Sequence, residues 1–248
     1  MQDLTLVIQE NTKLTDKMYR MVLTDQAGAE KLLVQKPGQF VNIKIDGFFL
    51  RRPISVCDSS EGSVTILYAV VGKGTKTLSE MKPGKTLSVL CGLGNGYDTS
   101  LSGQTPILLG GGAGVPPMYL LAKKLLEEGK QVTVCLGFNT ASEVYYDEEF
   151  YKIGCRVVLA TADGSLGAKG FVTDIMPEEY SYLYTCGPEP MLKAVYQKAK
   201  TSGQFSFEER MGCGFGACMG CSCKTITGYK RICKDGPVLT KEEILWED

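Results

Sequence analysis

The sequence of 248 residues contains no histidine and only one tryptophan. A Rieske iron–sulfur centre needs two histidine ligands and is therefore excluded. Neither sign of charge dominates, because 27 basic residues stand against 28 acidic ones. A role on nucleic acid or at a membrane surface, which would need a basic excess, has no electrostatic support, and we expect no partner of either kind.

Long apolar runs are also missing. The sequence has no stretch of eighteen apolar residues, and its opening MQDLTLVIQENTKL lacks the basic start, apolar centre and cleavage site of a secretion signal. We therefore expect a cytoplasmic protein. In a reducing compartment the ten cysteines should be thiols or metal ligands, since structural disulfides rarely persist there.

Three kinds of pattern divide the chain. Residues 1–98 predict an antiparallel barrel or sandwich from short alternating runs: LTLVIQ, MYRMVLT, QFVNIKI, RRPISVC, SVTILYAVV and TLSVLCG. Residues 103–202 alternate apolar β-rich runs with amphipathic segments and glycine turns, which predicts a parallel α/β domain. Residues 205–248 are rich in cysteine and too short to fold on their own without a cross-link such as a metal site. The expected fold is multidomain, β plus α/β, with a small C-terminal domain.

Five of the ten cysteines lie close together near the C-terminus. Cys213, Cys218 and Cys221 have the spacing C-x4-C-x2-C, with Cys233 beyond them, which is the spacing of a plant-type [2Fe-2S] cluster. A zinc site fits this spacing poorly, and scattered structural thiols are the other alternative. Neighbouring glycines would let the backbone wrap around a cluster. Cys223 is expected to be a spare thiol on the opposite face.

A one-electron cluster calls for a group that also handles two electrons, so we expect a flavin site in the barrel. Residues 52–55 read Arg-Pro-Ile-Ser, in which the arginine can pair with a diphosphate and the serine can reach a ring nitrogen. The stretch VVGKGTKTLSEM adds glycines and a helix start whose N–H groups could cradle phosphate. Such a turn is often only a turn, but the two motifs follow one another in one β domain.

A nucleotide site is expected in the α/β domain. An apolar run leads into a glycine turn and a helix start, a combination that favours a diphosphate at Gly110, Gly111, Gly112, Ala113 and Gly114. The turn is not G-x-G-x-x-G, and a plain β–α turn is the alternative. A second glycine turn follows a later strand at Cys186, Gly187 and Pro188. Because ligands lie off the carboxyl ends of parallel strands, the two turns could share one nucleotide.

The loop GFNTASEVYYDEEF indicates which pyridine nucleotide binds. A 2′-phosphate would need lysine or arginine, and none occurs before Lys152. NAD is therefore favoured over NADP, although the acidic loop could also be a solvated helix start.

The order RPIS, GKGT, GGGAGVPPM, CGPEPM and a C-terminal C-x4-C-x2-C…C resembles that of the ferredoxin–NADP reductase superfamily over essentially the whole chain. Within it, the chain is similar to the electron-transfer subunits of class B dihydroorotate dehydrogenases, most specifically in EERMGCGFGACMGC…CKDGP. The three regions would then be an FAD-binding barrel (1–98), an NAD-binding domain (103–202) and a [2Fe-2S] domain (205–248). The resemblance implies FAD contacts at Arg52, Pro53, Ile54, Ser55, Leu67, Tyr68, Ala69, Gly74 and Thr75. It implies cluster ligands at Cys213, Cys218, Cys221 and Cys233.

One position departs from the resemblance. In this family an arginine often follows the tyrosine, where this chain has Ala69. One flavin contact is then missing or is supplied from elsewhere, and Lys73 or Lys76 could take its place.

The resemblance further implies a subunit of an NAD-dependent oxidoreductase with FAD, a [2Fe-2S] cluster and NAD as cofactors. Electrons would come from the FMN of a dihydroorotate dehydrogenase catalytic partner, in pyrimidine biosynthesis, within a heterotetramer of two copies of each chain. No catalytic residue is expected here, because hydride transfer between nicotinamide and flavin needs positioning and no protein base. Two alternatives stay open: a reductase subunit for another partner, such as a sulfide dehydrogenase or a ferredoxin reductase, and a non-catalytic metal-binding redox module.

The cysteine-rich segment also carries apolar side chains at Met211, Phe215 and Met219. The segment is too short to bury them all within itself, so we expect a partner to cover one side of it. Packing against the FAD domain is the alternative.

Overall fold

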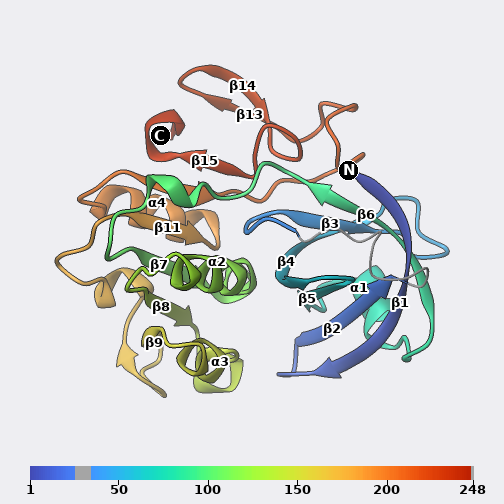
Figure 1. Cartoon of the computed structure of the whole chain (residues 1–248), viewed down its shortest axis with the longest axis horizontal. Coiled ribbons are helices and arrows are strands. Elements are labelled where there is room, and N and C mark those ends of the chain that lie inside the picture. Colours follow the sequence, from blue (N-terminus) through green and yellow to red (C-terminus); the bar gives the residue numbers. More distant parts are fainter. Residues whose placement is uncertain (26–34, 247–248) are drawn as a thin grey trace.

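A computed structural model describes residues 1–25 and 35–246 of the chain. In Figure 1 the barrel lies on the right, the α/β sheet on the left, and the cysteine-rich segment across the top. Within the described ranges, no helix is both long enough and apolar enough to span a membrane.

The N-terminal part is a closed antiparallel barrel with strand order β1-β2-β5-β4-β3-β6. Its elements are β1 (Gln2–Lys13), β2 (Met18–Asp25), β3 (Phe40–Ile43), β4 (Arg52–Ser60), β5 (Ser63–Ala69), α1 (Lys73–Ser79) and β6 (Thr86–Leu93). The alternation in sequence sends one side of each strand inward, so that Leu6, Met21 and Ile66 are fully buried in one core. The predicted barrel is confirmed, and each predicted run contains a strand.

The second part is a seven-stranded sheet with order β10-β9-β8-β7-β11-β12-β15. Its strands are β7 (Ile107–Gly111), β8 (Thr133–Phe138), β9 (Arg156–Thr161), β10 (Ala168–Lys169), β11 (Leu183–Cys186), β12 (Gly203–Ser206) and β15 (Val238–Thr240). The helices are α2 (Pro116–Glu127), α3 (Asp147–Lys152) and α4 (Glu189–Lys198). All pairs are parallel except β12–β15, so the predicted parallel α/β architecture is confirmed.

The strand order reverses between β7 and β11. From β7 the chain first builds outward through β8 and β9, and it then returns to place β11 on the other side of β7. A crevice opens at such a point beyond the carboxyl ends of the two strands, and ligands of open α/β sheets bind there. The two glycine turns identified in the sequence begin in the last residues of these strands, since Gly110 and Gly111 end β7 and Cys186 ends β11.

Short 3₁₀ turns complete the described elements: η1 (Thr99–Leu101), η2 (Gly112–Gly114), η3 (Ala141–Glu143), η4 (Val172–Ile175) and η5 (Lys241–Glu243). The turn η2 joins β7 to α2 and contains the first of the two glycine turns.

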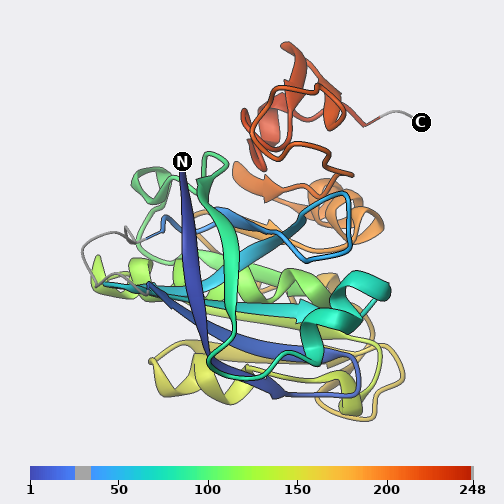
Figure 2. The ribbon, with the colours of Figure 1, turned by 90° about the vertical axis from the view of Figure 1, so that its right-hand side faces the viewer.

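The cysteine-rich segment projects above the other two parts in Figure 2. It forms a loop, the hairpin of β13 (Ser222–Thr225) and β14 (Gly228–Arg231), and then β15, which pairs with β12. Phe205 of β12 and Leu239 of β15 share a buried cluster with Ile232, which explains how so small a segment is held. The expected α/β domain ends at residue 202 and the expected C-terminal domain begins at residue 205, whereas β12 spans Gly203–Ser206 and β15 belongs to the α/β sheet. These domain limits remain a prediction.

Polar contacts fix the barrel against the α/β sheet. Lys123 of α2 pairs with Asp58 of β4 at 2.7 Å, and the Tyr97 hydroxyl donates to the Thr185 carbonyl at 3.0 Å. The side-chain amide of Asn95 donates to the Val238 carbonyl at 2.7 Å, which joins the C-terminal segment to the same region. The three parts therefore meet at one junction.

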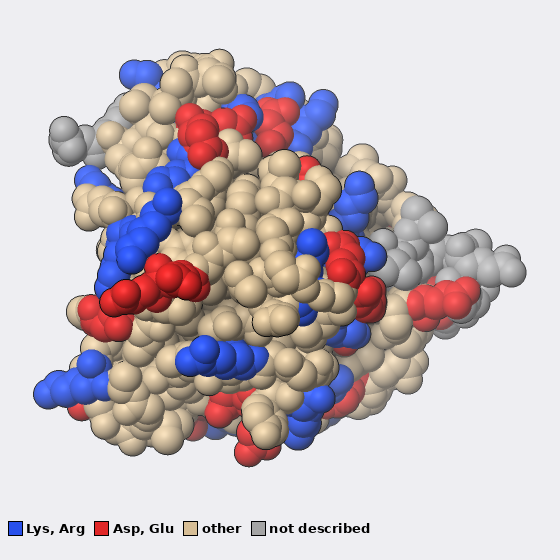
Figure 3. Space-filling view, turned by 60° about the vertical axis from the view of Figure 1, so that its left-hand side comes forward, with Lys and Arg blue, Asp and Glu red and all other residues tan. Residues whose placement is uncertain are grey.

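The surface carries both signs of charge, as the near-neutral composition predicts. On the face in Figure 3, acidic and basic side chains are interspersed around a broad area of uncharged residues. Such a mixed face gives no strong field of one sign.

Candidate functional site

A cleft of about 390 Å³ lies at the junction of the three parts. Barrel strands β4 and β5 form one wall, the turns after β7 and β11 form another, and the segment from Ser206 to Met211 closes a third side. The predicted cofactor residues that line it are Pro53, Ile54, Ser55, Leu67, Tyr68, Ala69, Thr75, Gly111, Ala113, Gly114, Cys186, Gly187 and Pro188. The structure therefore brings the predicted flavin motif and both predicted nucleotide turns to one cavity.

The two glycine turns lie against each other. A Cβ atom on Gly114 would stand 2.2 Å from the Cys186 carbonyl oxygen and 2.5 Å from the Gly187 nitrogen. Real Cβ atoms do not approach backbone so closely, so only glycine fits at Gly114. Gly111 is similarly tight, with Met191 Sδ 2.3 Å from its ideal Cβ position. This contact supports the expectation that the two turns share one nucleotide.

The other predicted cofactor residues, Arg52, Gly74, Gly110 and Gly112, do not line the cavity. The Arg52 guanidinium lies over the Phe48 ring at 5.0 Å, and its Nε is 2.5 Å from the ideal Cβ position of Gly74. Arg-Pro-Ile-Ser and Gly-Lys-Gly-Thr, which are separate in sequence, therefore touch in the fold. The Thr75 hydroxyl accepts hydrogen bonds from the N–H groups of Val71 and Gly72 at 3.0 and 3.2 Å, which fixes the turn before α1.

The four predicted ligand cysteines come together as two pairs. The N–H of Cys213 donates to Cys218 Sγ at 3.5 Å, and the N–H of Cys233 donates to Cys221 Sγ at 3.4 Å. Cys221 and Cys233 are buried, whereas Cys218 is exposed. Two thiol pairs suit a cluster of two irons, since each iron takes two cysteine ligands. Within the described ranges, no group of three or more cysteine or acidic side chains is arranged to hold one metal ion.

The backbone around Cys213 favours a thiolate. Partial burial of the thiol opposes ionisation, but backbone N–H groups of Phe215, Cys218 and Ala217 point at the sulfur and lower its pKa to about 6. The Ala217 bond is the shortest, at 3.2 Å. These donors belong to the loop that the neighbouring glycines were expected to wrap around a cluster, and a thiolate is the form that binds iron.

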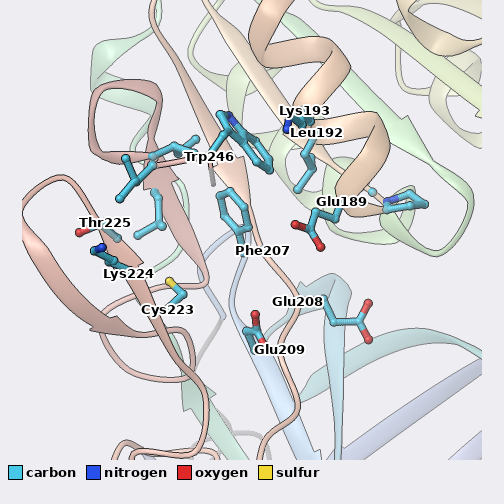
Figure 4. A pocket seen from close by; sticks show the side chains of 15 residues that line it. Glu189, Leu192, Lys193, Phe207, Glu208, Glu209, Cys223, Lys224, Thr225 and Trp246 are labelled. Carbon is cyan, nitrogen blue, oxygen red and sulfur yellow. The ribbon is translucent and has the colours of Figure 1, made fainter. Parts of the chain in front are cut away.

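Cys223 has different surroundings from the four paired cysteines. It lines a second cavity of about 420 Å³ between α4 and the hairpin, which the paired cysteines do not line. Figure 4 shows its sulfur on the hairpin side of this cavity, with Phe207 and Trp246 between it and the side chains of α4. Burial, followed by the nearby carboxylate of Glu209, raises the pKa of its thiol. Cys223 therefore has surroundings separate from those of the four paired cysteines, and its role as a spare thiol remains a prediction.

Eight residues that line the main cavity were not among the cofactor residues predicted from the sequence. They are Phe40, Val71, Ser206, Phe207, Glu208, Glu209, Met211 and Pro237. Phe207, Glu208 and Glu209 line both cavities. Their position depends on how β12 leads into the cysteine-rich loop, which is a tertiary feature. Five of the eight lie in motifs noted in the sequence, Val71 in VVGKGTKTLSEM and Glu208, Glu209, Met211 and Pro237 in EERMGCGFGACMGC…CKDGP, but neither motif indicated that they line this cavity.

The loop that favoured NAD over NADP follows β8. Its Glu143 carboxylate accepts from the Asn139 side-chain amide at 2.8 Å and from the Asn139 N–H at 3.3 Å. Lys152 lies in the last turn of α3, where it pairs with Glu148 and Glu149 at 3.6 Å. The nearest basic side chain in sequence is therefore engaged by acidic neighbours, and Glu143 places negative charge at the loop.

Comparisons with known proteins agree with this architecture. Residues 208–245 match the iron–sulfur cluster binding domain of dihydroorotate dehydrogenase B, and residues 108–197 match an oxidoreductase NAD-binding domain. A solved structure described as an NADH-dependent reduced ferredoxin-NADP oxidoreductase superposes with a TM-score of 0.86 and 30% identity, covering 99% of this chain and 91% of that one. Phthalate dioxygenase reductase shares the fold at 18% identity, with a TM-score of 0.65 over 79% of this chain and 64% of that one.

Two curated relatives extend over nearly the whole chain. Both are electron transfer subunits of dihydroorotate dehydrogenase B (NAD(+)): the protein of Geobacillus sp. (strain WCH70) is 42% identical over 97% of each chain, and that of Fusobacterium nucleatum is 43% identical over 96% of each. The fold and site define an oxidoreductase component of the ferredoxin–NADP reductase type with an iron–sulfur segment at its C-terminus. The chain belongs to the family of dihydroorotate dehydrogenase B (NAD(+)) electron transfer subunits.

Proposed function

We propose that this chain holds FAD in the main cavity, NAD at the two glycine turns and a [2Fe-2S] cluster at Cys213, Cys218, Cys221 and Cys233. One observation carries the proposal. The cavity lined by the barrel motif and by both glycine turns is also lined by Met211, two residues before the first cysteine of the loop. This observation supports adjoining sites for a flavin, a nucleotide and a cluster.

The residues present fit these groups. For the cluster, the four thiols form two pairs, and an ideal Cβ on Gly212 would lie only 3.2 Å from Cys218 Sγ, so the loop passes close to the sulfur. For the flavin, Ile54 and Leu67 give the cavity an apolar wall and Ser55 adds a hydroxyl. This combination suits the flavin ring, which has one apolar edge and one polar edge. Lys73 and Lys76 belong to α1, beside Arg52, where they could supply the contact that Ala69 lacks.

A bound flavin supplies both hydride exchange with nicotinamide and single-electron exchange with a cluster. The chain's own contribution is placement. The apolar wall excludes water from the ring, and the close contact of Gly114 with Cys186 lets the nucleotide turns approach one another. The described cavity has no histidine, and hydride transfer between two positioned rings does not need one.

The partner we propose is an FMN-containing dihydroorotate dehydrogenase catalytic subunit, in a heterotetramer with two copies of each chain. The curated relatives are named as subunits of that enzyme, which supports a partner of this kind. Phe215 and Met219 are 43% and 55% exposed on the cluster loop, and Met219 adopts the left-handed backbone conformation at φ 61°. Exposed apolar side chains beside a redox centre favour a protein surface that covers them.

A second candidate partner is a larger iron–sulfur flavoprotein. The 30% identity to a structure described as an NADH-dependent reduced ferredoxin-NADP oxidoreductase favours a reductase other than dihydroorotate dehydrogenase as the enzyme to which the partner belongs. The two candidate partners carry different cofactors, so identifying the protein that copurifies with this chain distinguishes them.

Tagged chain purified with its natural partner tests the proposal. We expect visible absorption of a flavin and an iron–sulfur cluster, FAD after denaturation, two irons per chain as in a [2Fe-2S] centre, and a copurifying FMN protein. A copurifying iron–sulfur flavoprotein without FMN would support the second candidate. A colourless protein with stoichiometric zinc would contradict both.

A further inference from the structure

Two adjacent tyrosines follow β8 and point to different parts of the molecule. Tyr145 is 6% exposed, and its hydroxyl donates to the Gly112 carbonyl at 2.7 Å. The hydroxyl of Tyr146 instead interacts with Arg20 and Cys57 of the barrel. Tyr146 has φ 68°, a left-handed conformation that is rare for a bulky residue, and this backbone turn separates the two side chains.

The acceptor of the Tyr145 hydroxyl lies in the first glycine turn. Gly112 has φ 50°, which glycine adopts readily, and its carbonyl also accepts from the Val115 N–H at 3.2 Å. Tyr145 itself is held by an edge-to-face contact with Phe138, whose ring centroid lies 5.4 Å away. Burial raises the pKa of Tyr145, so the hydroxyl stays protonated and remains a donor.

Holding this carbonyl sets the direction of the next N–H. In a trans peptide the C=O of one residue and the N–H of the next point in opposite directions. Neither Gly112 nor Tyr145 lines the main cavity, whereas Ala113 does. With the Gly112 carbonyl directed at Tyr145, the Ala113 N–H is directed away from that side. Backbone N–H groups in such a turn are donors for anionic oxygens.

We propose that Tyr145 is a positioning residue for the dinucleotide: its hydroxyl holds the Gly112 carbonyl so that the Ala113 N–H faces the diphosphate. The inference rests on the proposed NAD site and adds to it a residue with no motif of its own. Tyr145 touches neither the cofactor nor the reacting atoms, and it acts through the peptide that joins Gly112 to Ala113.

The test compares Tyr145→Phe with Tyr146→Phe in the full chain loaded with its cofactors. Each change removes one hydroxyl, but only the first removes the bond to Gly112. One lost hydrogen bond of this kind corresponds to about threefold to tenfold in affinity. We expect Tyr145→Phe to raise the KM for NADH by about that factor with an artificial acceptor, with kcat changed less than about twofold. Its dissociation constant for ADP-ribose, a redox-inert probe measured by calorimetry, should rise by the same factor.

Tyr146→Phe should leave both nucleotide constants at the wild-type values. Equal constants for Tyr145→Phe and the wild type would overturn the inference. A parallel fall in kcat and in FAD content in Tyr145→Phe would also overturn it, because that result would assign the tyrosine a general structural role. A wild-type chain that binds no ADP-ribose would refute the proposed nucleotide site itself, and the inference with it.

Discussion

Cys221 and Cys223 are separated by one residue, yet their thiols face different surroundings. Cys221 pairs with the backbone N–H of Cys233 in a buried position, and Cys223 lines the cavity beside α4. We predict that Cys223→Ser retains the visible absorption and iron content of the cluster, because only the other four cysteines have plant-type spacing. Cys221→Ser is the matched control and should bleach the protein. Bleaching by Cys223→Ser but not by Cys221→Ser would show that the ligand set is wrong.

The side chain of Arg52 connects the two barrel motifs, Arg-Pro-Ile-Ser and Gly-Lys-Gly-Thr. Its guanidinium lies between the Phe48 ring and Gly74, next to the turn proposed for the FAD diphosphate. Lysine cannot reproduce a planar pair of donors, so Arg52→Lys should raise the FAD dissociation constant roughly tenfold while the fold persists. Flavin release after dilution measures this, and Arg156→Lys, on β9, is the control. Unchanged flavin affinity would show that another side chain, such as Lys73 or Lys76, makes the diphosphate contact.

At the level of elements, the cluster loop and the segment that carries Cys233 are joined by Arg231, at the end of β14. Its guanidinium donates to the Gly216 carbonyl at 3.1 Å and forms two bonds with the Asp235 carboxylate at 2.8 and 3.0 Å. These bonds lower the pKa of Asp235 to about 2. The arginine therefore connects the loop of the first thiol pair to the backbone of the second.

Arg231→Gln should loosen this connection and speed loss of the cluster. We expect bleaching in the presence of an iron chelator to be roughly threefold to tenfold faster than in the wild type, since a charge-assisted hydrogen bond is removed. Arg231→Lys keeps the charge but not the forked geometry, and its rate should fall between the two. Arg156→Gln makes the same charge change on β9 and should bleach at the wild-type rate. A common rate for all variants would show that the loop does not depend on Arg231.

The elements could largely be predicted from sequence because their signals are local. Period-two alternation gave the barrel strands, and the apolar runs before Gly110 and Gly187 gave the strands that carry the glycine turns. Pairing of β15 with β12 had no local signal, since Val238–Thr240 is short and follows a loop. The Tyr145 bond to Gly112 was equally hidden, because it joins loops that are distant in sequence. Residues that close the cavity through such long-range contacts were therefore missed.

Across the whole molecule, the sites follow one another from the nucleotide turns to the exposed loop. The turns and the barrel share the cavity, Met211 lines it, and the cysteine loop extends from there to the surface, where Phe215 is exposed. A redox centre near the surface can exchange electrons with the redox centre of a bound partner. The chain alone should accordingly oxidise NADH with an artificial acceptor yet leave dihydroorotate unchanged, because no second flavin site or base for that substrate is recognisable in the sequence.

Phe215→Asp separates these two activities. An aspartate at the proposed interface would place a charge against a desolvated partner surface, whereas the nucleotide turns lie on other elements. Adding the partner subunit should create dihydroorotate-dependent NAD⁺ reduction in the wild type. In Phe215→Asp that coupled rate should fall about tenfold or more at limiting partner, while NADH oxidation by the artificial acceptor changes less than about twofold. Phe171→Asp is the matched control, since Phe171 is 69% exposed and precedes η4 in the α/β part, and both of its rates should match the wild type. Equal damage to the two activities by Phe215→Asp, or turnover of dihydroorotate by the chain alone, would contradict the proposed division between a nucleotide-handling chain and a substrate-handling partner.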